Sequence, residues 1–164
     1  MVAAPYSSVA AAKGGEIRHF HLNANRQWEE ASRVPLPDNL NRLSGFGHAI
    51  ALTDQRALIS APGSHDGGAA FLYQQQDGMW SQPTAIDQTS LRQDHRIDGD
   101  VALIGDLALV STVSEIGNAV WLFDAADGSP LGKLDFPPSH EPNGLIDVSS
   151  NQLAVALKDG GVQF

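Results

Sequence analysis

Histidines with carboxylates close by are the residues of this chain best suited to chemistry. Imidazole beside a carboxylate can ligate a metal ion, or act as a general acid or base near neutral pH. Six residues form this candidate set, called the loop-face set below: His48, His65, Asp66, His95, Asp98 and His140. Further acids lie near them in the sequence: Asp94, Asp100, Glu115 and Glu141. The alternative is that polar residues simply occupy polar loops, which need not meet.

Several kinds of active site are excluded by residues that the sequence lacks. The chain has no cysteine, so disulfides, thiolate metal sites and cysteine nucleophiles are excluded. It contains no G-x-S-x-G element, no phosphate-binding glycine loop and no H-E-x-x-H motif. The glycine pairs at 14–15, 67–68 and 160–161 each precede an expected strand. We therefore interpret them as turn residues and not as a nucleotide-binding motif.

Two further groups of residues have a chemical and a structural interpretation. His19 and His21 are two apart in an expected strand, so both face one side of a sheet. A metal clip is possible there, but a polar face between sheets or toward solvent is the favoured interpretation. Trp28, Trp80 and Trp121 could stack on a ligand. Because Trp28 and Trp80 recur at equivalent repeat positions, we expect core packing instead.

The elements that must position these residues are short β-strands. The stretch 45–80 contains three runs of five or six residues, HAIAL, ALISAP and AAFLYQ. Polar turns at 53–55 and 77–78 and a small-residue loop at 63–67 bound these runs. Runs of this length between Gly, Pro, Asp or Asn are typical of antiparallel strands.

Weaker copies of this unit occur on both sides of it. ALIS at 57–60 matches ALVS at 108–111, a spacing of 51 residues. Self-similarity with a period of about 45–57 residues and four short strands per period is typical of propeller blades. The sequence therefore predicts an all-β fold, a partial β-propeller of about four blades with four-stranded antiparallel sheets. The expected blades are residues 1–36, 45–86, 97–136 and 144–164. A β-sandwich with incidental self-similarity is the alternative.

The first and last blades are expected to be incomplete. Residues 1–36 supply the second, third and fourth strands of a blade, and residues 144–164 supply the first three. These pieces do not add up to one blade, and exposed strand edges invite aggregation. We therefore expect a single propeller segment over 1–164, whose remaining blades come from missing sequence or from another chain.

The central stretch resembles a known repeat. Phe46-Gly47 followed by Ala61-Pro62-Gly63, with GGAAFLY and a tryptophan after them, is similar to the FG-GAP repeat of integrin α-chain propellers and of many bacterial extracellular proteins. Ser60 stands where the first glycine of GAP is usual. The match is good over 45–86, partial over 2–36, looser over 97–136 and weak over 144–164.

The resemblance implies a location, a geometry and a function. Each blade would place its first strand along a central channel and its fourth strand outermost. The protein would be extracellular or periplasmic, although the segment contains no signal peptide. It would be a non-enzymatic scaffold that binds a protein or a glycan. The alternatives are a propeller hydrolase or lyase that uses the loop-face set, and a purely structural domain of a larger surface protein.

The resemblance also raises the question of calcium. Family members often bind Ca²⁺ in the hairpin between the first two strands, through an acidic D-x-D-x-D-G loop. Such a site needs several converging oxygen ligands. The corresponding turns here, at 53–55, 105–106 and 150–152, each hold at most one acid. We therefore expect no calcium site in these blades and no other cofactor.

Composition restricts the partners. The net charge is -9 and the 10 basic residues are scattered, which argues against binding to nucleic acid. No apolar run approaches the ~20 residues that a membrane-spanning helix needs, so no membrane span is expected.

Overall fold

The chain folds almost entirely into β-structure. The computed structural model describes residues 1–5, 15–38, 40, 43–64, 67–91, 95–137, 139–158 and 160–163. These residues form four antiparallel sheets and one short 3-10 helix, η1 (Gln88–Ser90). Within the described ranges, no helix is long and apolar enough to cross a membrane. The prediction of an all-β fold is confirmed.

Each sheet is built from one contiguous segment of the chain, with its strands side by side in sequence order. The first sheet contains β1 (Val2–Ala4), β2 (Glu16–Leu22) and β3 (Trp28–Arg33). The second contains β4 (Ile50–Leu52), β5 (Arg56–Ala61), β6 (Ala69–Gln76), β7 (Met79–Trp80) and β8 (Thr84–Ala85). The third contains β9 (Arg96–Ile104), β10 (Leu107–Val113), β11 (Ala119–Asp124) and β12 (Pro130–Lys133). The fourth contains β13 (Pro142–Ser149), β14 (Gln152–Leu157) and β15 (Val162–Gln163).

The number of strands differs from the prediction in the second sheet. Its fourth strand is broken into β7 and β8, which both pair with β6. The pairing shifts by one residue across the break, from Gln75 opposite Trp80 to Leu72 opposite Thr84. Pro83 lies in the break and has no N–H to donate to β6, so the ladder is interrupted there. The third sheet has four strands, and the first and fourth have three each in the part of the chain described.

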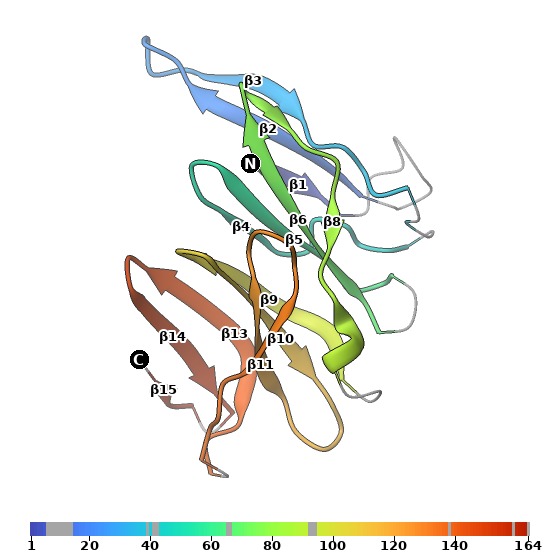
Figure 1. Cartoon of the computed structure of the whole chain (residues 1–164). Coiled ribbons are helices and arrows are strands. Elements are labelled where there is room, and N and C mark those ends of the chain that lie inside the picture. Colours follow the sequence, from blue (N-terminus) through green and yellow to red (C-terminus); the bar gives the residue numbers. More distant parts are fainter. Residues whose placement is uncertain are drawn as a thin grey trace.

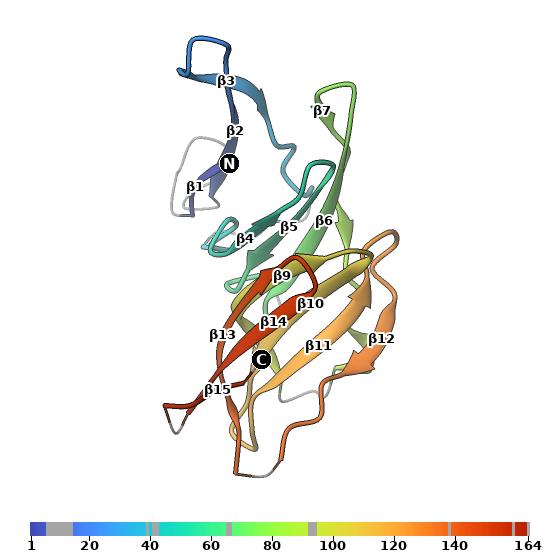
Figure 2. The same ribbon diagram turned by 90° about the vertical axis from the view of Figure 1, so that its left-hand side faces the viewer.

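The four sheets follow one another in space in the order of the sequence (Figure 1 and Figure 2). β3 contacts β7, β4 and β5 contact β9, and β9 contacts β13. The first strands of the second, third and fourth sheets are therefore neighbours. The turns that join β4 to β5, β9 to β10 and β13 to β14 lie together on the left-hand side of Figure 1.

Three apolar cores fill the spaces between the sheets. Successive side chains of a strand point to opposite faces of its sheet. On β5, Ile59 packs in the core shared with the first sheet, and Leu58 packs in the core shared with the third. On β10, Val110 faces the second sheet and Leu109 the fourth. Both faces of the two middle sheets are therefore covered, which explains the near-continuous burial of β5 and β10.

Two glycines allow neighbouring sheets to approach closely. Gly15 and Gly68 precede β2 and β6 and have φ angles of +97° and +87°. A Cβ on Gly15 would lie 2.2 Å from the carbonyl oxygen of Phe46, and one on Gly68 would lie 2.4 Å from that of Ile97. Both carbonyls belong to the next sheet or the segment that leads into it. These glycines are therefore more than turn residues, because they also set the distance between sheets.

The tryptophans divide between core and surface. Trp80 and Trp121 are 7% and 8% exposed and lie in the cores, as expected, whereas Trp28 is 69% exposed. Trp28 pairs with Leu22 on the face of the first sheet opposite to Ile17, whose side chain packs toward the second sheet. No sheet of the described residues covers that face. The prediction that Trp28 lies in the core is therefore wrong.

Candidate functional site

The described members of the loop-face set have separate surroundings. His48 is exposed in the turn before β4, where its backbone N–H donates to the Gly45 carbonyl at 2.9 Å. Asp98 is exposed near the start of β9, where the pairing with β10 is interrupted. His140 is half-buried in the connection from β12 to β13, and its Nδ1 lies 2.8 Å from the Ser139 hydroxyl.

His95 is packed against the third sheet. Its Nδ1 lies 2.9 Å from Thr112 Oγ1, and its ring meets Trp121 edge-on with the centroids 6.1 Å apart. The Thr112 hydroxyl donates to the Ala119 carbonyl at 3.4 Å, which leaves its oxygen to accept from the imidazole N–H. These contacts hold the ring in one orientation.

The two remaining members, His65 and Asp66, lie outside the described residues. Gly67, the next described residue, contacts the start of β9, because its carbonyl accepts from the Ile97 N–H at 2.7 Å. The connection between β5 and β6 therefore meets the connection into the third sheet. Among the residues that are described, no group of three or more His, Asp or Glu side chains is arranged to hold a metal ion. A joint site of the loop-face set stays a prediction.

Glu141, just before β13, links the loop between β10 and β11 to the loop after β14. Its carboxylate accepts from the Asn118 N–H at 2.8 Å and from Lys158 Nζ at 2.5 Å. The hydrogen bond from Lys158 is the main cause that lowers the pKa of Glu141, and the Asn118 N–H adds to it. A carboxylate kept ionised in this way suits a structural role better than that of a general acid.

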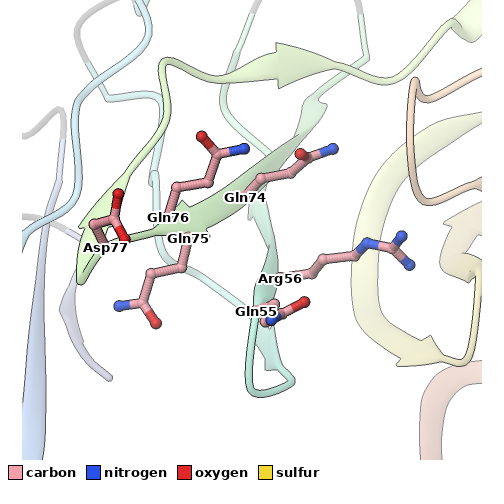
Figure 3. Close-up of a pocket in the computed structure, with 6 residues that line it drawn as sticks. All are labelled: Gln55, Arg56, Gln74, Gln75, Gln76 and Asp77. Atoms are coloured by element: carbon pink, nitrogen blue, oxygen red, sulfur yellow. The ribbon is translucent and has the colours of Figure 1, made fainter.

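A different candidate lies at the end of the second sheet that carries the β4–β5 and β6–β7 turns. An open groove of about 530 Å³ is formed there at the end of the second sheet (Figure 3). Six residues line this glutamine groove: Gln55, Arg56, Gln74, Gln75, Gln76 and Asp77.

The sequence of β6 explains why polar groups gather there. Its side chains are buried up to Tyr73, and the three glutamines that follow extend beyond the core. Asp77 and Gly78 then turn the chain with φ angles of +51° and +77°, as in a tight two-residue hairpin turn. Figure 3 shows Gln74 and Gln76 on one side of β6 and Gln75 on the other. The end of β6 therefore presents amide groups on both of its faces.

Three side chains of the groove are anchored to the neighbouring sheets. Arg56 Nη1 donates to Asp106 Oδ1 at 2.8 Å and to the Gly105 carbonyl at 3.3 Å, in the turn between β9 and β10. Gln74 Nε2 donates to the Ala126 carbonyl at 3.3 Å in the third sheet. On the other side, Gln75 Nε2 lies 3.4 Å from His19 Nδ1 in the first sheet.

The anchor on His19 depends on a neutral ring. Burial lowers the pKa of His19, and the positive charges of the N-terminus and of His21 lower it further. A neutral imidazole can accept the Gln75 amide proton at Nδ1, and the ring also lies edge-on to Trp80 with centroids 5.6 Å apart. The expectation of a polar face between sheets therefore holds for His19. His21 is exposed and lies 3.7 Å from Glu29.

The groove is built for hydrogen bonding and not for proton transfer. Each amide offers two donors and an acceptor. Among the described lining residues, the titratable ones are Arg56, whose charge is balanced by Asp106, and Asp77. Ordered amides with no acid–base pair suit a ligand with many hydroxyl or amide groups, such as a glycan or an extended peptide.

Sequence reasoning missed this groove. The one visible signal was the run QQQDG directly after the apolar AAFLY. A polar run before a turn is ordinary, however. The anchors come from residues far away in the sequence, and only the stacking of three sheets brings them together.

The comparisons with known proteins add no relative. No protein-family model matches the chain, and no curated protein matches it.

Proposed function

We propose that this chain is a segment of an FG-GAP-like β-propeller that acts as a non-enzymatic binding scaffold for a protein or a glycan, outside the cell or in the periplasm. The location follows from the resemblance over 45–86 alone. The chain would form an arc of the propeller, with its remaining blades supplied by other sequence.

The stacking of the sheets supports the propeller geometry. Each sheet is a meander of one segment, and the sheets contact one another in sequence order. The neighbouring positions of β4, β9 and β13 agree with first strands that surround a common axis. Such a scaffold keeps the hairpin turns in fixed positions, as a binding surface requires.

The observation that carries the binding function is the glutamine groove. Two of its four amides are anchored, Gln75 on the first sheet and Gln74 on the third. Side chains ordered before binding lose less conformational entropy when a ligand arrives. A groove of this kind favours recognition of a neutral polar ligand over its chemical conversion.

The test is a binding screen against defined oligosaccharides and defined extended peptides, followed by calorimetry on the ligands that bind. Gln55 and Gln76 line the groove from exposed positions. Each lost hydrogen bond is worth about 0.5–1.5 kcal/mol, so the double variant Gln55→Ala/Gln76→Ala should weaken binding about fivefold or more. Gln27→Ala, an exposed glutamine of the β2–β3 turn, is the matched control and should bind like the wild type.

The same screen separates binding from catalysis. A non-enzymatic scaffold leaves each bound ligand intact over hours of incubation. The hydrolase or lyase alternative would be established instead if a ligand is converted, and if this conversion is lost in His48→Ala or His140→Ala but retained in the groove variant. Binding that is unchanged in the groove variant would contradict the assignment of the groove.

A further inference from the structure

His19 connects the first sheet to the glutamine groove. Its Nδ1 lies 3.4 Å from Gln75 Nε2 and 3.5 Å from the Ser32 hydroxyl. Its ring also lies edge-on to the buried ring of Trp80. Gln75 is half-buried and lines the groove, so one side chain contacts both the imidazole and the groove. The protonation state of His19 can therefore act on the groove through Gln75.

The neutral and the charged imidazole need opposite partners at Nδ1. A ring nitrogen that accepts from an amide N–H must offer a lone pair, so the neutral ring carries its proton on Nε2. Protonation places a second N–H on Nδ1 and removes that lone pair. The NH₂ group of Gln75 then faces another donor, which is unfavourable. The Ser32 hydroxyl can donate or accept, so it fits both forms of the ring.

The surroundings of His19 favour the neutral ring. Burial is the main cause that lowers its pKa, and the positive charges of the N-terminus and of His21 lower it further. The second sheet contributes only uncharged groups there, from Gln75 of β6 and Trp80 of β7. The charged side chains of β2 and β3 pair with one another: Arg18 with Glu16 and Glu30, His21 with Glu29, and Arg33 with Glu30. In the described part of the chain no carboxylate forms an ion pair with His19, so the ring gains its charge only in acid.

We propose that protonation of His19 turns the side-chain amide of Gln75 around, so that its nitrogen and its oxygen exchange places. At neutral pH the nitrogen donates to the imidazole, and the oxygen is left to accept from a ligand in the groove. In acid the oxygen accepts from the Nδ1–H group, and the NH₂ group faces the groove as a donor. The groove thus offers an acceptor at this position on one side of the transition and a donor on the other.

The turn makes binding in the groove sensitive to pH. A ligand that donates to the Gln75 oxygen loses that hydrogen bond in acid, and its affinity falls roughly two- to twelvefold. By linkage, the same ligand lowers the pKa of His19 further when it binds. This regulatory consequence rests on the proposed function of the groove, whereas the turn of the amide does not.

The test is a nuclear magnetic resonance titration of the isotope-labelled protein without ligand, from neutral pH to the end of the His19 transition. The signals that disappear in Gln75→Ala identify the side-chain amide of Gln75. Its protons should show nuclear Overhauser contacts to the His19 ring at neutral pH and lose them in acid. The midpoint of this change should equal the pKa of His19, which lies below 6.5. The amide of Gln74, which donates to the Ala126 carbonyl, is the control and should keep its contacts throughout.

Two variants separate the turn from a general effect of acid. In His19→Gln the Gln75 amide should not change over the same pH range, because no imidazole remains beside it. In His21→Gln the transition should remain and move to higher pH, because one neighbouring positive charge is gone. If His19→Gln is not folded, as judged by circular dichroism, the comparison of Gln75 with Gln74 in the wild type decides.

Two results overturn the proposal. One is that the contacts of the Gln75 amide persist in acid although the His19 ring has become protonated. The other is that the transition of Gln75 survives in His19→Gln. No ligand enters this experiment, so the turn of the amide and the proposed binding function can fail separately.

Discussion

Replacement of Gly68 by alanine tests whether close approach between sheets stabilises the fold. The residue has a φ of +87°, and an L-residue in the left-handed region costs roughly 1–2 kcal/mol. The new Cβ would also lie 2.4 Å from the Ile97 carbonyl oxygen. Ordinary contact begins near 3.4 Å, so the second and third sheets must separate by about 1 Å. Overpacking of this kind typically costs about 1–3 kcal/mol, so Gly68→Ala should lower the free energy of unfolding by about 2–5 kcal/mol.

Gly78→Ala provides the matched control. Its φ of +77° is similar, and a Cβ there would meet nothing within 4 Å. It should therefore lose only the backbone term of about 1–2 kcal/mol. Urea denaturation followed by tryptophan fluorescence measures both variants, and the difference between them isolates the contact between sheets. Equal losses for the two variants would refute the reasoning, since they would show that the Ile97 carbonyl does not restrict position 68.

Three other predictions concern single groups. Tyr73→Phe should lower the free energy of unfolding by about 1–3 kcal/mol in urea, because the buried hydroxyl donates to the Pro35 carbonyl at 2.8 Å and the variant leaves that oxygen unpaired. The pKa of His19 in the folded protein lies below its ordinary value of 6.5, because the fold favours the neutral ring. The stability that the neutral ring provides is complete above pH 6.5, and it is lost as the pH falls through the folded pKa. The free energy of unfolding should therefore decrease as the pH falls from 7.5, and His19→Gln should make this decrease smaller. An unchanged pH dependence in the variant would contradict the role of His19. Finally, neither Ca²⁺ nor a chelator should change the melting temperature. A rise with Ca²⁺ would show that the chain does bind calcium.

The all-β fold could be predicted because the residues that end each strand are local signals in the sequence. Each short apolar run is followed by Gly, Pro, Asp or Asn, and this pattern repeats at a nearly constant spacing. Contiguous meander sheets need only such local signals, since every strand pairs with its neighbours in sequence. The expected blade ranges and the propeller geometry remain predictions, because they concern rotation between sheets and not pairing within them.

Features that depend on contacts between sheets could not be predicted. Trp28 and Trp80 hold similar repeat positions, but only Trp80 has a sheet against it. Pro83 breaks the fourth strand of the second sheet, although an edge strand in general tolerates proline. The glutamine groove needs His19 and Ala126 from the two flanking sheets. Packing partners of this kind leave no signal at the residue itself.

The construction of each sheet from one contiguous segment has a consequence for how the chain acquires its structure. Hairpins between strands that are close in sequence cost little loop-closure entropy and form early. Each sheet can therefore complete its backbone hydrogen bonds before the next segment has left the ribosome, and the newest sheet can then pack on the one already formed. Folding can therefore begin in one sheet and spread to its neighbours, and a defect in one sheet would impede most the sheets that pack directly against it.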